Sequence, residues 1–210
     1  MESIGAFFLV LTVCLATHPG TGAGALAPLA IGGALGVMVF AGGHISGGHY
    51  NPAVSTAVFV RGRLSHRDFA GYLIAQLCAA ALAGLLARAL LGAAPDPVAV
   101  SAIWKLAVVE LLFTFALAYV VLNVATSDAT VGNSFYGLAI GGTVAVGALA
   151  AGGLSGGAFN PAVALGASIF GTFAWSHLWA YILAEILGGS LAAGSFIYLE
   201  RPEPGSPGAE

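Results

Sequence analysis

The sequence contains one eight-residue motif twice, and the two copies divide the chain into similar halves. Residues 47–54 read Gly-Gly-His-Tyr-Asn-Pro-Ala-Val, and residues 156–163 read Gly-Gly-Ala-Phe-Asn-Pro-Ala-Val. An Asn side chain accepts a hydrogen bond from a free N–H of the first helical turn, and Pro suits the first helical position. Each copy therefore predicts an irregular loop followed by a short helix, over about 52–60 and 161–170.

The rest of the chain is apolar enough to lie in a lipid bilayer. Of the 210 residues, 59% are hydrophobic and 7% are charged, whereas soluble domains carry about 25% charged residues. A membrane-spanning helix needs about 20 mostly apolar residues. Six segments qualify, although the first is short: 3–17, 24–42, 69–91, 104–124, 135–152 and 176–199. The two segments that begin at Asn are about half that length, so each reaches only part of the way across.

The two halves of the chain repeat beyond this motif. Glu2 lies at the start of the first predicted span and Glu110 lies near the start of the fourth, and residues 72–76 match residues 181–185. Each half contains three full spans and one short helix. Because three is an odd number, the second half enters the membrane from the opposite side, which predicts an inverted repeat.

We therefore expect an all-α membrane protein with six transmembrane helices and two re-entrant half-helices. A single transmembrane domain covers residues 1–200, with the first repeat at 1–91 and the second at 104–200. The tail 201–210 is rich in Pro, Gly and Glu, and a segment of this composition is expected to be disordered.

The basic residues predict the orientation in the membrane. Loops that carry an excess of Lys and Arg remain in the cytoplasm. The excess lies in Arg61, Arg63, Arg67 and Arg201, against Arg88 and Lys105 on the other side. We expect a multi-pass protein of the plasma (inner) membrane with both termini in the cytoplasm.

The two Gly-rich loops are expected to meet inside the protein. Irregular backbone at membrane depth must be buried or must line a watery cavity, and the positive N-terminal ends of the two half-helices then face each other near the midplane. The amides of Asn51 and Asn160 can offer N–H donors to a passing molecule. The loop carbonyls form a ladder of acceptors at Gly47, Gly48, His49, Tyr50, Gly156, Ala158 and Phe159. Such a pore favours small neutral molecules, repels cations and interrupts a proton wire.

The whole chain resembles the aquaporin/aquaglyceroporin (major intrinsic protein) family. The resemblance is carried by residues 43–54 and 152–162. In both stretches Ser-Gly-Gly is followed by two residues, the second of them aromatic, and then by the Asn-Pro-Ala triplet. The triplets are Asn51, Pro52 and Ala53, and Asn160, Pro161 and Ala162. The resemblance implies a passive channel for water or small neutral solutes, a homotetramer with one pore per protomer, no enzymatic activity, and no cofactor or metal.

One departure from the family pattern affects the expected selectivity. The resemblance is to bacterial-type or TIP-like members, but most of the family has Arg three residues after the second Asn, where this chain has Val163. By family spacing, the other constriction positions are Ile31, Ala148 and Gly157. This apolar filter lacks a fixed cation, so solutes larger than water, such as glycerol, urea, ammonia or hydrogen peroxide, are expected to pass.

Three acidic residues are expected at membrane depth, where ionisable groups are usually functional. The resemblance implies that Glu2 and Glu110 support the two loops, each carboxylate accepting N–H bonds from the loop backbone. Glu185 occupies the place of Gln76 in the other repeat, and Gln at that place is common in the family. We expect Glu185 to be protonated and hydrogen-bonded, with proton sensing as the alternative.

Other functions remain as alternatives. An ion- or proton-coupled secondary transporter would also use inverted repeats and a buried acid such as Glu185. An intramembrane serine protease could use Ser155 and His177, but it would leave the Asn-Pro-Ala motifs unexplained. A non-conducting structural protein is the third alternative. The net charge of −3 does not indicate nucleic-acid binding, which is typical of basic chains. The spacing of Cys14 and Cys78 does not match a metal-binding motif or a disulfide framework.

Overall fold

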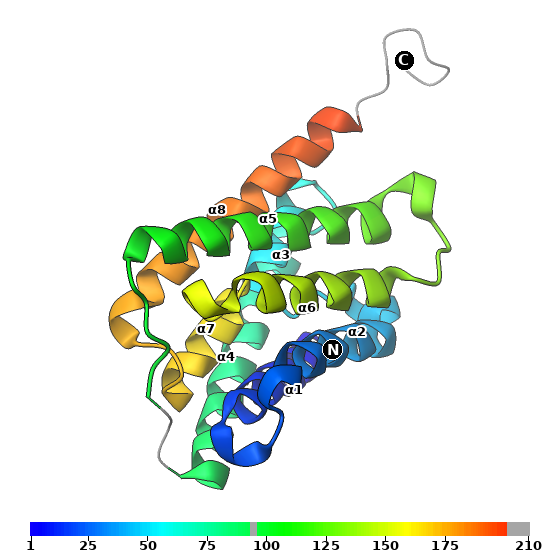
Figure 1. The fold of residues 1–210 in the computed structure, drawn as a ribbon. Coiled ribbons are helices and arrows are strands. Elements are labelled where there is room, and N and C mark those ends of the chain that lie inside the picture. The colour runs from blue at the N-terminus through cyan, green and yellow to red at the C-terminus, as the bar shows by residue number, and fades with distance from the viewer. Residues whose placement is uncertain (93–95, 201–210) are drawn as a thin grey trace, which may run out of the picture.

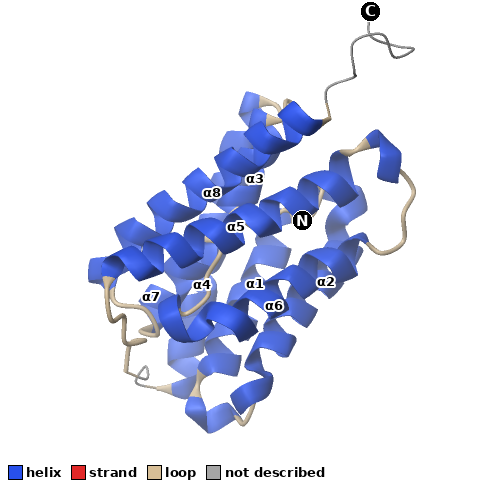
Figure 2. Cartoon of the chain, turned by 45° about the horizontal axis from the view of Figure 1, so that its top comes forward, coloured by secondary structure: helices blue, strands red, loops and turns tan. Residues whose placement is uncertain are grey.

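The structure, a computed structural model, describes residues 1–92 and 96–200, and every regular element there is helical (Figure 1, Figure 2). The α-helices are α1 (Glu2–Thr17), α2 (Ala27–Ser46), α3 (Pro52–Val60), α4 (His66–Leu91), α5 (Ile103–Thr126), α6 (Tyr136–Ser155), α7 (Pro161–Phe170) and α8 (Leu178–Leu199). Short 3-10 turns lie at Pro19–Thr21, Gly24–Leu26, Asp128–Thr130 and Trp175–His177. The predicted disordered tail lies outside the described residues.

The helices confirm the predicted all-α architecture of six spans and two half-helices. In the described residues, five helical segments are long and apolar enough to cross a membrane. The sixth span, α1, has 16 residues and is shorter than the usual length of about 20. The two half-helices are α3, with 9 residues, and α7, with 10.

Two helices extend about one turn beyond the apolar segments that predicted them. Helix α2 continues to Ser46 and α6 continues to Ser155. The hydroxyl of each serine donates a hydrogen bond of 2.6 Å to a buried carboxylate, Glu2 or Glu110. Hydropathy placed these helix ends too early because polar partners inside the protein, rather than lipid, stabilise the last turn.

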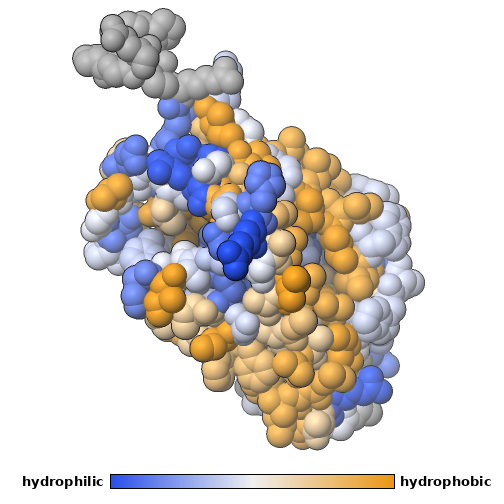
Figure 3. All heavy atoms as spheres, turned by 180° about the vertical axis from the view of Figure 1, so that it is seen from behind, coloured by the Kyte–Doolittle hydropathy of each residue, from blue (hydrophilic) through white to orange (hydrophobic). Residues whose placement is uncertain are grey.

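The surface is largely apolar, as a lipid-facing protein requires. Figure 3 shows apolar side chains over much of one face, with hydrophilic residues gathered toward its ends. Large side chains such as Leu138, Ile74 and Leu183 are 71%, 65% and 63% exposed. Soluble monomers rarely expose continuous apolar patches of this extent, so lipid or neighbouring protein must cover this surface.

Helices α2 and α6 pack closely side by side (Figure 1). A Cβ built on Gly32 would lie 2.4 Å from the carbonyl oxygen of Gly141, and one built on Gly36 would lie 2.9 Å from that of Gly137. Only glycine permits this approach of two backbones. The four-residue spacing of the two glycines in each helix is typical of membrane helices whose backbones approach closely.

Each half-helix packs against the last full helix of the opposite repeat. Helix α3 packs on α8, and α7 packs on α4. A Cβ on Gly189 of α8 would lie 2.5 Å from the carbonyl oxygen of Ala53, and one on Gly84 of α4 would lie 2.5 Å from that of Gly166. The two repeats are therefore interlocked through backbone contacts at the beginning and middle of the half-helices.

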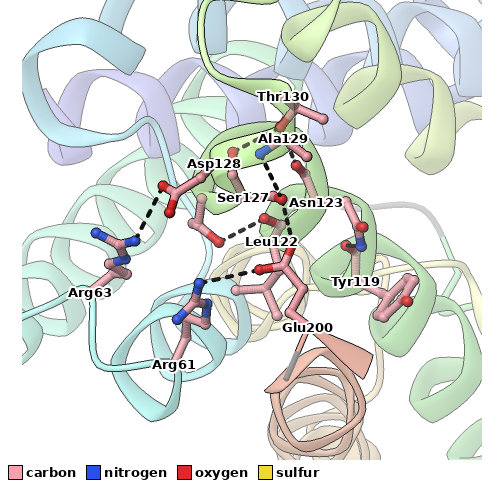
Figure 4. Close-up of polar contacts among 11 residues, drawn as sticks. Arg61, Arg63, Tyr119, Leu122, Asn123, Ser127, Asp128, Ala129, Thr130 and Glu200 are labelled. Carbon is pink, nitrogen blue, oxygen red and sulfur yellow. Dashed lines mark hydrogen bonds and ion pairs between the residues drawn. The ribbon is translucent and has the colours of Figure 1, made fainter. Parts of the chain in front are cut away.

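A polar cluster joins three elements at the end of the bundle where α8 terminates (Figure 4). Glu200, just after α8, pairs with Arg61 at 3.4 Å and accepts a hydrogen bond from the Ser127 hydroxyl. The Arg61 guanidinium also lies 4.9 Å from the ring centre of Phe196. The cluster ties the end of α3 to the end of α8 and to the turn after α5.

Removing the Arg61–Glu200 pair is expected to have a small effect on stability. The two side chains are 21% and 33% exposed, and ion pairs in such positions contribute about 1 kcal/mol or less after solvent screening. We expect Glu200→Gln to lower the free energy of unfolding by no more than this amount, and by less in high salt. Thermal unfolding in detergent at two salt concentrations measures it. A loss of more than about 2 kcal/mol would contradict this expectation, because a value of that size is typical of breaking an ion pair that is shielded from solvent.

Candidate functional site

The site lies where α3 and α7 begin, and each helix is capped by the Asn that precedes it. The Asn51 side-chain oxygen accepts from the backbone N–H of Ala53 at 2.8 Å. The Asn160 side-chain oxygen accepts from the N–H of Ala162 at 2.9 Å. The caps satisfy donors that the first turn leaves free. They also fix the direction of each side chain, so the amide nitrogen points away from its own helix.

The two amide nitrogens connect the loops of the opposite repeats. Asn51 Nδ2 donates to the carbonyl oxygen of Phe159 at 2.9 Å, and Asn160 Nδ2 donates to that of Tyr50 at 3.0 Å. An amide nitrogen carries two hydrogens. From the sequence we expect both amides to serve a passing molecule. In the structure one hydrogen of each amide holds the other loop, so only the second hydrogen of each can serve that role.

The aromatic residue before each Asn has a strained backbone. Tyr50 and Phe159 have φ values of 51° and 50°, in the left-handed region that bulky residues rarely adopt. Such a conformation persists only where the surrounding structure imposes it. Here the carbonyl of each aromatic residue is held by the Asn of the other repeat, and its N–H is held by a buried carboxylate.

In the first repeat that carboxylate is Glu2. Its Oε1 accepts from the Ser46 hydroxyl at 2.6 Å and from the N–H of His49 at 3.1 Å, and its Oε2 accepts from the N–H of Tyr50 at 2.7 Å. The Gln76 amide nitrogen also donates to Oε2, at 2.7 Å, so four donors form strong charge-assisted bonds to one buried carboxylate. Glu2 therefore holds the end of α2 and the loop that follows it in one arrangement.

In the second repeat Glu110 makes the equivalent contacts. It accepts from the Ser155 hydroxyl at 2.6 Å, from the N–H of Ala158 at 3.1 Å and from the N–H of Phe159 at 2.7 Å. The two serines were not predicted as members of this network. Their repetition in the Ser-Gly-Gly context was the signal that could have identified them.

His49 occupies a side pocket of the first loop. Its Nδ1 lies 3.1 Å from the Ser55 hydroxyl, and its ring packs edge-on against Tyr72, with 5.2 Å between ring centres. The side chain is buried and borders the cavity described next. The ring therefore has one polar partner from α3 and one aromatic neighbour from α4.

A narrow cavity runs past the two Asn side chains between the full helices. Its polar lining residues are His49, Asn51 and Asn160, and Gly157 also borders it. The apolar lining residues are Leu9, Val13, Ile31, Leu35, Val54, Leu117, Val121, Ile140, Val144, Ala158 and Val163. Within the described part of the chain, no Lys, Arg, Asp or Glu borders this cavity.

The residues of the expected filter lie close together. Ile31, Gly157 and Val163 border the cavity, whereas Ala148 does not. Ala148 nevertheless lies next to Gly157, because a Cβ on this glycine would be 3.5 Å from the Ala148 Cα. Val163 is 4% exposed, and it lies where the family resemblance would place an arginine.

The residues of the expected carbonyl ladder are divided between the cavity and its surroundings. His49 and Ala158 border the cavity, while the rings of Tyr50 and Phe159 are buried in the protein. Gly47, Gly48 and Gly156 lie in the two loops with φ of 83°, 65° and 94°. These positive values suit glycine.

Comparison with known proteins identifies the family of this chain. The family model of the major intrinsic proteins matches residues 2–198. The chain is 40% identical to the glycerol uptake facilitator protein-like 6 of Lactiplantibacillus plantarum, with 91% of this chain and 93% of that protein covered. It is 38% identical to aquaporin NIP1-3 of Oryza sativa subsp. japonica, with 94% and 71% covered.

A solved structure supports the same assignment at the level of the fold. The X-ray structure of the aquaglyceroporin from Plasmodium falciparum matches 93% of this chain and 92% of that chain, with a TM-score of 0.74 and 20% sequence identity. The family match covers nearly the whole chain, including both Asn-Pro-Ala triplets, which the structure brings together at the cavity. By its sequence and its fold, the chain belongs to the major intrinsic protein family.

Proposed function

We propose that this protein is a passive membrane channel for water and small uncharged solutes, with the conducting path between the two Asn-Pro-Ala loops. The observation that carries the proposal is the meeting of Asn51 and Asn160 in a cavity that no charged side chain borders in the described residues. The remaining amide hydrogens offer two donors at the narrow centre of an otherwise apolar path. A solute with hydrogen-bonding groups can exchange its water contacts for these donors.

The same centre excludes cations and protons. The N-termini of α3 and α7 face each other, and each carries roughly half a positive charge. A water that accepts hydrogen bonds from both amides cannot also relay a proton along a continuous chain. Because Val163 supplies no positive charge, the exclusion of cations in this protein depends mainly on the N-terminal ends of α3 and α7.

We further propose that the filter passes solutes larger than water. Ile31, Ala148, Gly157 and Val163 provide no long or charged side chain to narrow the path. The similarity to a protein named as a glycerol uptake facilitator supports glycerol as one solute. Urea, ammonia and hydrogen peroxide are small and neutral as well.

A coupled transporter is less well supported. Coupling to protons or ions requires an ionisable group that the transported solute can reach. The buried acids Glu2, Glu110 and Glu185 do not border the cavity. We therefore expect flux down the solute gradient only, with no accumulation when a proton gradient is imposed.

The exposed apolar surface supports an assembly in the membrane. We propose a homotetramer in the plasma membrane, with both termini in the cytoplasm and one path in each protomer. Cross-linking in native membranes tests the tetramer, and accessibility of engineered cysteines at the loop carrying Arg61 and Arg63 tests the orientation.

The function is tested by stopped-flow light scattering on proteoliposomes with water, glycerol, urea, ammonia and hydrogen peroxide. We expect rapid flux of water and of at least one solute, and no proton conductance above that of protein-free vesicles. Water flux with exclusion of all four solutes would contradict the wide filter. Uphill accumulation driven by a proton gradient would replace the channel with a transporter.

Replacing Val163 by Arg is expected to narrow the path. The long charged side chain would occupy the filter, so glycerol flux should fall roughly tenfold or more, which corresponds to about 1.4 kcal/mol in the barrier, while water flux persists. Val163→Met is the matched control, because it adds length without charge. If both variants conduct glycerol as the parent protein does, Val163 does not border the conducting path.

A further inference from the structure

The two repeats differ in how they hold their loop carboxylates. In the first repeat, the Gln76 amide nitrogen donates to Glu2 Oε2 at 2.7 Å and to the Ser55 hydroxyl at 2.9 Å. In the second repeat, Glu185 takes the place of Gln76 and Ala164 takes the place of Ser55. The second loop therefore lacks both the amide donor and the hydroxyl that support the first.

Glu185 is completely buried in the bundle. Its side chain is 0% exposed, and neither carboxyl oxygen has a hydrogen-bond partner in the described residues. Gly188 lies about one turn further along α8, and a Cβ on it would lie 2.5 Å from the carbonyl oxygen of Leu111, the residue after Glu110 on α5. Glu185 and Glu110 therefore lie on the facing sides of two packed helices. An ionised carboxylate in this position would be neither solvated nor paired with a positive charge, which is strongly unfavourable.

Two ionised carboxylates cannot share this site. Like charges in contact oppose the second ionisation, and such pairs in proteins hold one proton between them. Ionised carboxylates only accept hydrogen bonds, so a bond between the two acids requires a proton on one of them. We propose that Glu185 is a protonated carboxylic acid that donates its O–H to Glu110, and that it positions the second pore loop as Gln76 positions the first.

The proton belongs on Glu185 because Glu110 is already surrounded by donors. Glu110 accepts one hydroxyl and two backbone N–H bonds from the second loop, and these favour its ionised form. Glu185 accepts none, so it is the member of the pair that is stabilised by a proton.

In the described residues Glu185 forms no ion pair, and the 3-10 turn Trp175–His177, which precedes α8 and packs against it, contributes the titratable His177. On α5 the facing group is Glu110, and Lys105 lies at the first turn beside the Trp104 ring. On α8 itself, Tyr181 donates its O–H to the carbonyl of Ser155. Helices α3 and α7, which also pack on α8, contain no titratable residue. Loss of the Glu185 proton would therefore place two negative charges in contact and remove the bond that supports the loop.

Infrared spectroscopy of the protein in lipid tests the protonation directly. The carbonyl stretch of a protonated buried acid is expected at neutral pH in the parent protein and to shift in heavy water. The matched variant Glu185→Gln should lose this band, because it replaces the acid by the amide found in the first repeat. The control Glu200→Gln should retain it, because Glu200 lies near the surface and pairs with Arg61.

The pH profile of solute flux tests the positioning role. This arm depends on the proposed channel function, whereas the infrared measurement does not. Ionisation of Glu185 would remove the proposed bond to Glu110, so flux through the parent protein should fall about fivefold as the pH is raised stepwise from 7 into the alkaline range. Fivefold is the factor that one ordinary hydrogen bond is worth. In Glu185→Gln the ratio of flux at the two pH values should remain near one.

Two results would overturn the proposal. One is the absence of a protonated-acid band at neutral pH, or a band that persists in Glu185→Gln. The other is an identical pH profile in the parent protein and in Glu185→Gln, which would leave Glu185 without a positioning role. If no solute crosses the membrane in any variant, the channel proposal fails, and the infrared band still decides the state of Glu185.

Discussion

Replacing Glu110 by Ala is expected to prevent the second pore loop from folding. The carboxylate satisfies the Ser155 hydroxyl and the N–H groups of Ala158 and Phe159, and all of these are buried or nearly so. A buried donor left without a partner costs about 1–3 kcal/mol. Three of them would remove roughly 3–9 kcal/mol from a total stability of about 5–15 kcal/mol.

The measurement is the yield of monodisperse protein in detergent, its thermal unfolding, and glycerol flux. Ser155→Ala is the matched control, because it removes a single hydroxyl and leaves the carboxylate with two backbone donors. We expect this control to remain folded, with a loss of about 1 kcal/mol. Glu110→Ala protein that melted and conducted like its parent would show that the loop keeps its strained turn without the carboxylate.

Replacing Gly141 by Leu is expected to separate the two central helices. A Cβ at this position would lie 2.2 Å from the carbonyl oxygen of Gly32 and 2.9 Å from the backbone nitrogen of Gly36. Neither neighbour is a side chain that can rotate away, so α2 and α6 must move apart. Overpacking of a close-packed interior costs about 1–3 kcal/mol even where side chains can adjust. The cost here should reach the top of that range or exceed it, and both half-helix loops would lose their alignment.

The adjacent Gly142 provides the control. A Cβ at Gly142 would have no atom within 4 Å, and the residue is exposed on the outer face of α6. Gly142→Leu should therefore be neutral or slightly stabilising, because glycine within a helix is less favourable than a residue with a side chain by about 0.5–1 kcal/mol. Equal losses in folded yield for the two variants would contradict the close backbone contact between α2 and α6.

Much of this architecture follows from patterns that are local in the sequence. Asn followed by Pro favours a helix start through local chemistry alone, and both starts, at Asn51 and Asn160, are present with their caps. The apolar segments predicted six spans because a bilayer requires that length and composition. The glycine pairs of α2 and α6 were predictable because they share the small-residue spacing.

Other features depend on contacts between distant parts of the chain. The sequence offered the Asn51 amide as a donor for solutes, but its bond to the Phe159 carbonyl joins residues 108 positions apart. The positive φ of Tyr50 has no local cause, because tyrosine does not favour that conformation. It is imposed by Glu2 on one side and by Asn160 on the other.

The sequence by itself determined that the chain is a membrane protein of two inverted halves, each with a capped half-helix. That information is encoded in composition, repeat spacing and helix-start chemistry, all of which can be read along the chain without knowing which distant residues come into contact. Only the tertiary structure decided how the halves are joined: one hydrogen of each Asn amide is used across the repeat boundary, and Glu185 is enclosed beside Glu110. These contacts form only when the helices pack and exclude water. A buried polar group without a hydrogen-bond partner is strongly destabilised, because no water can replace that partner.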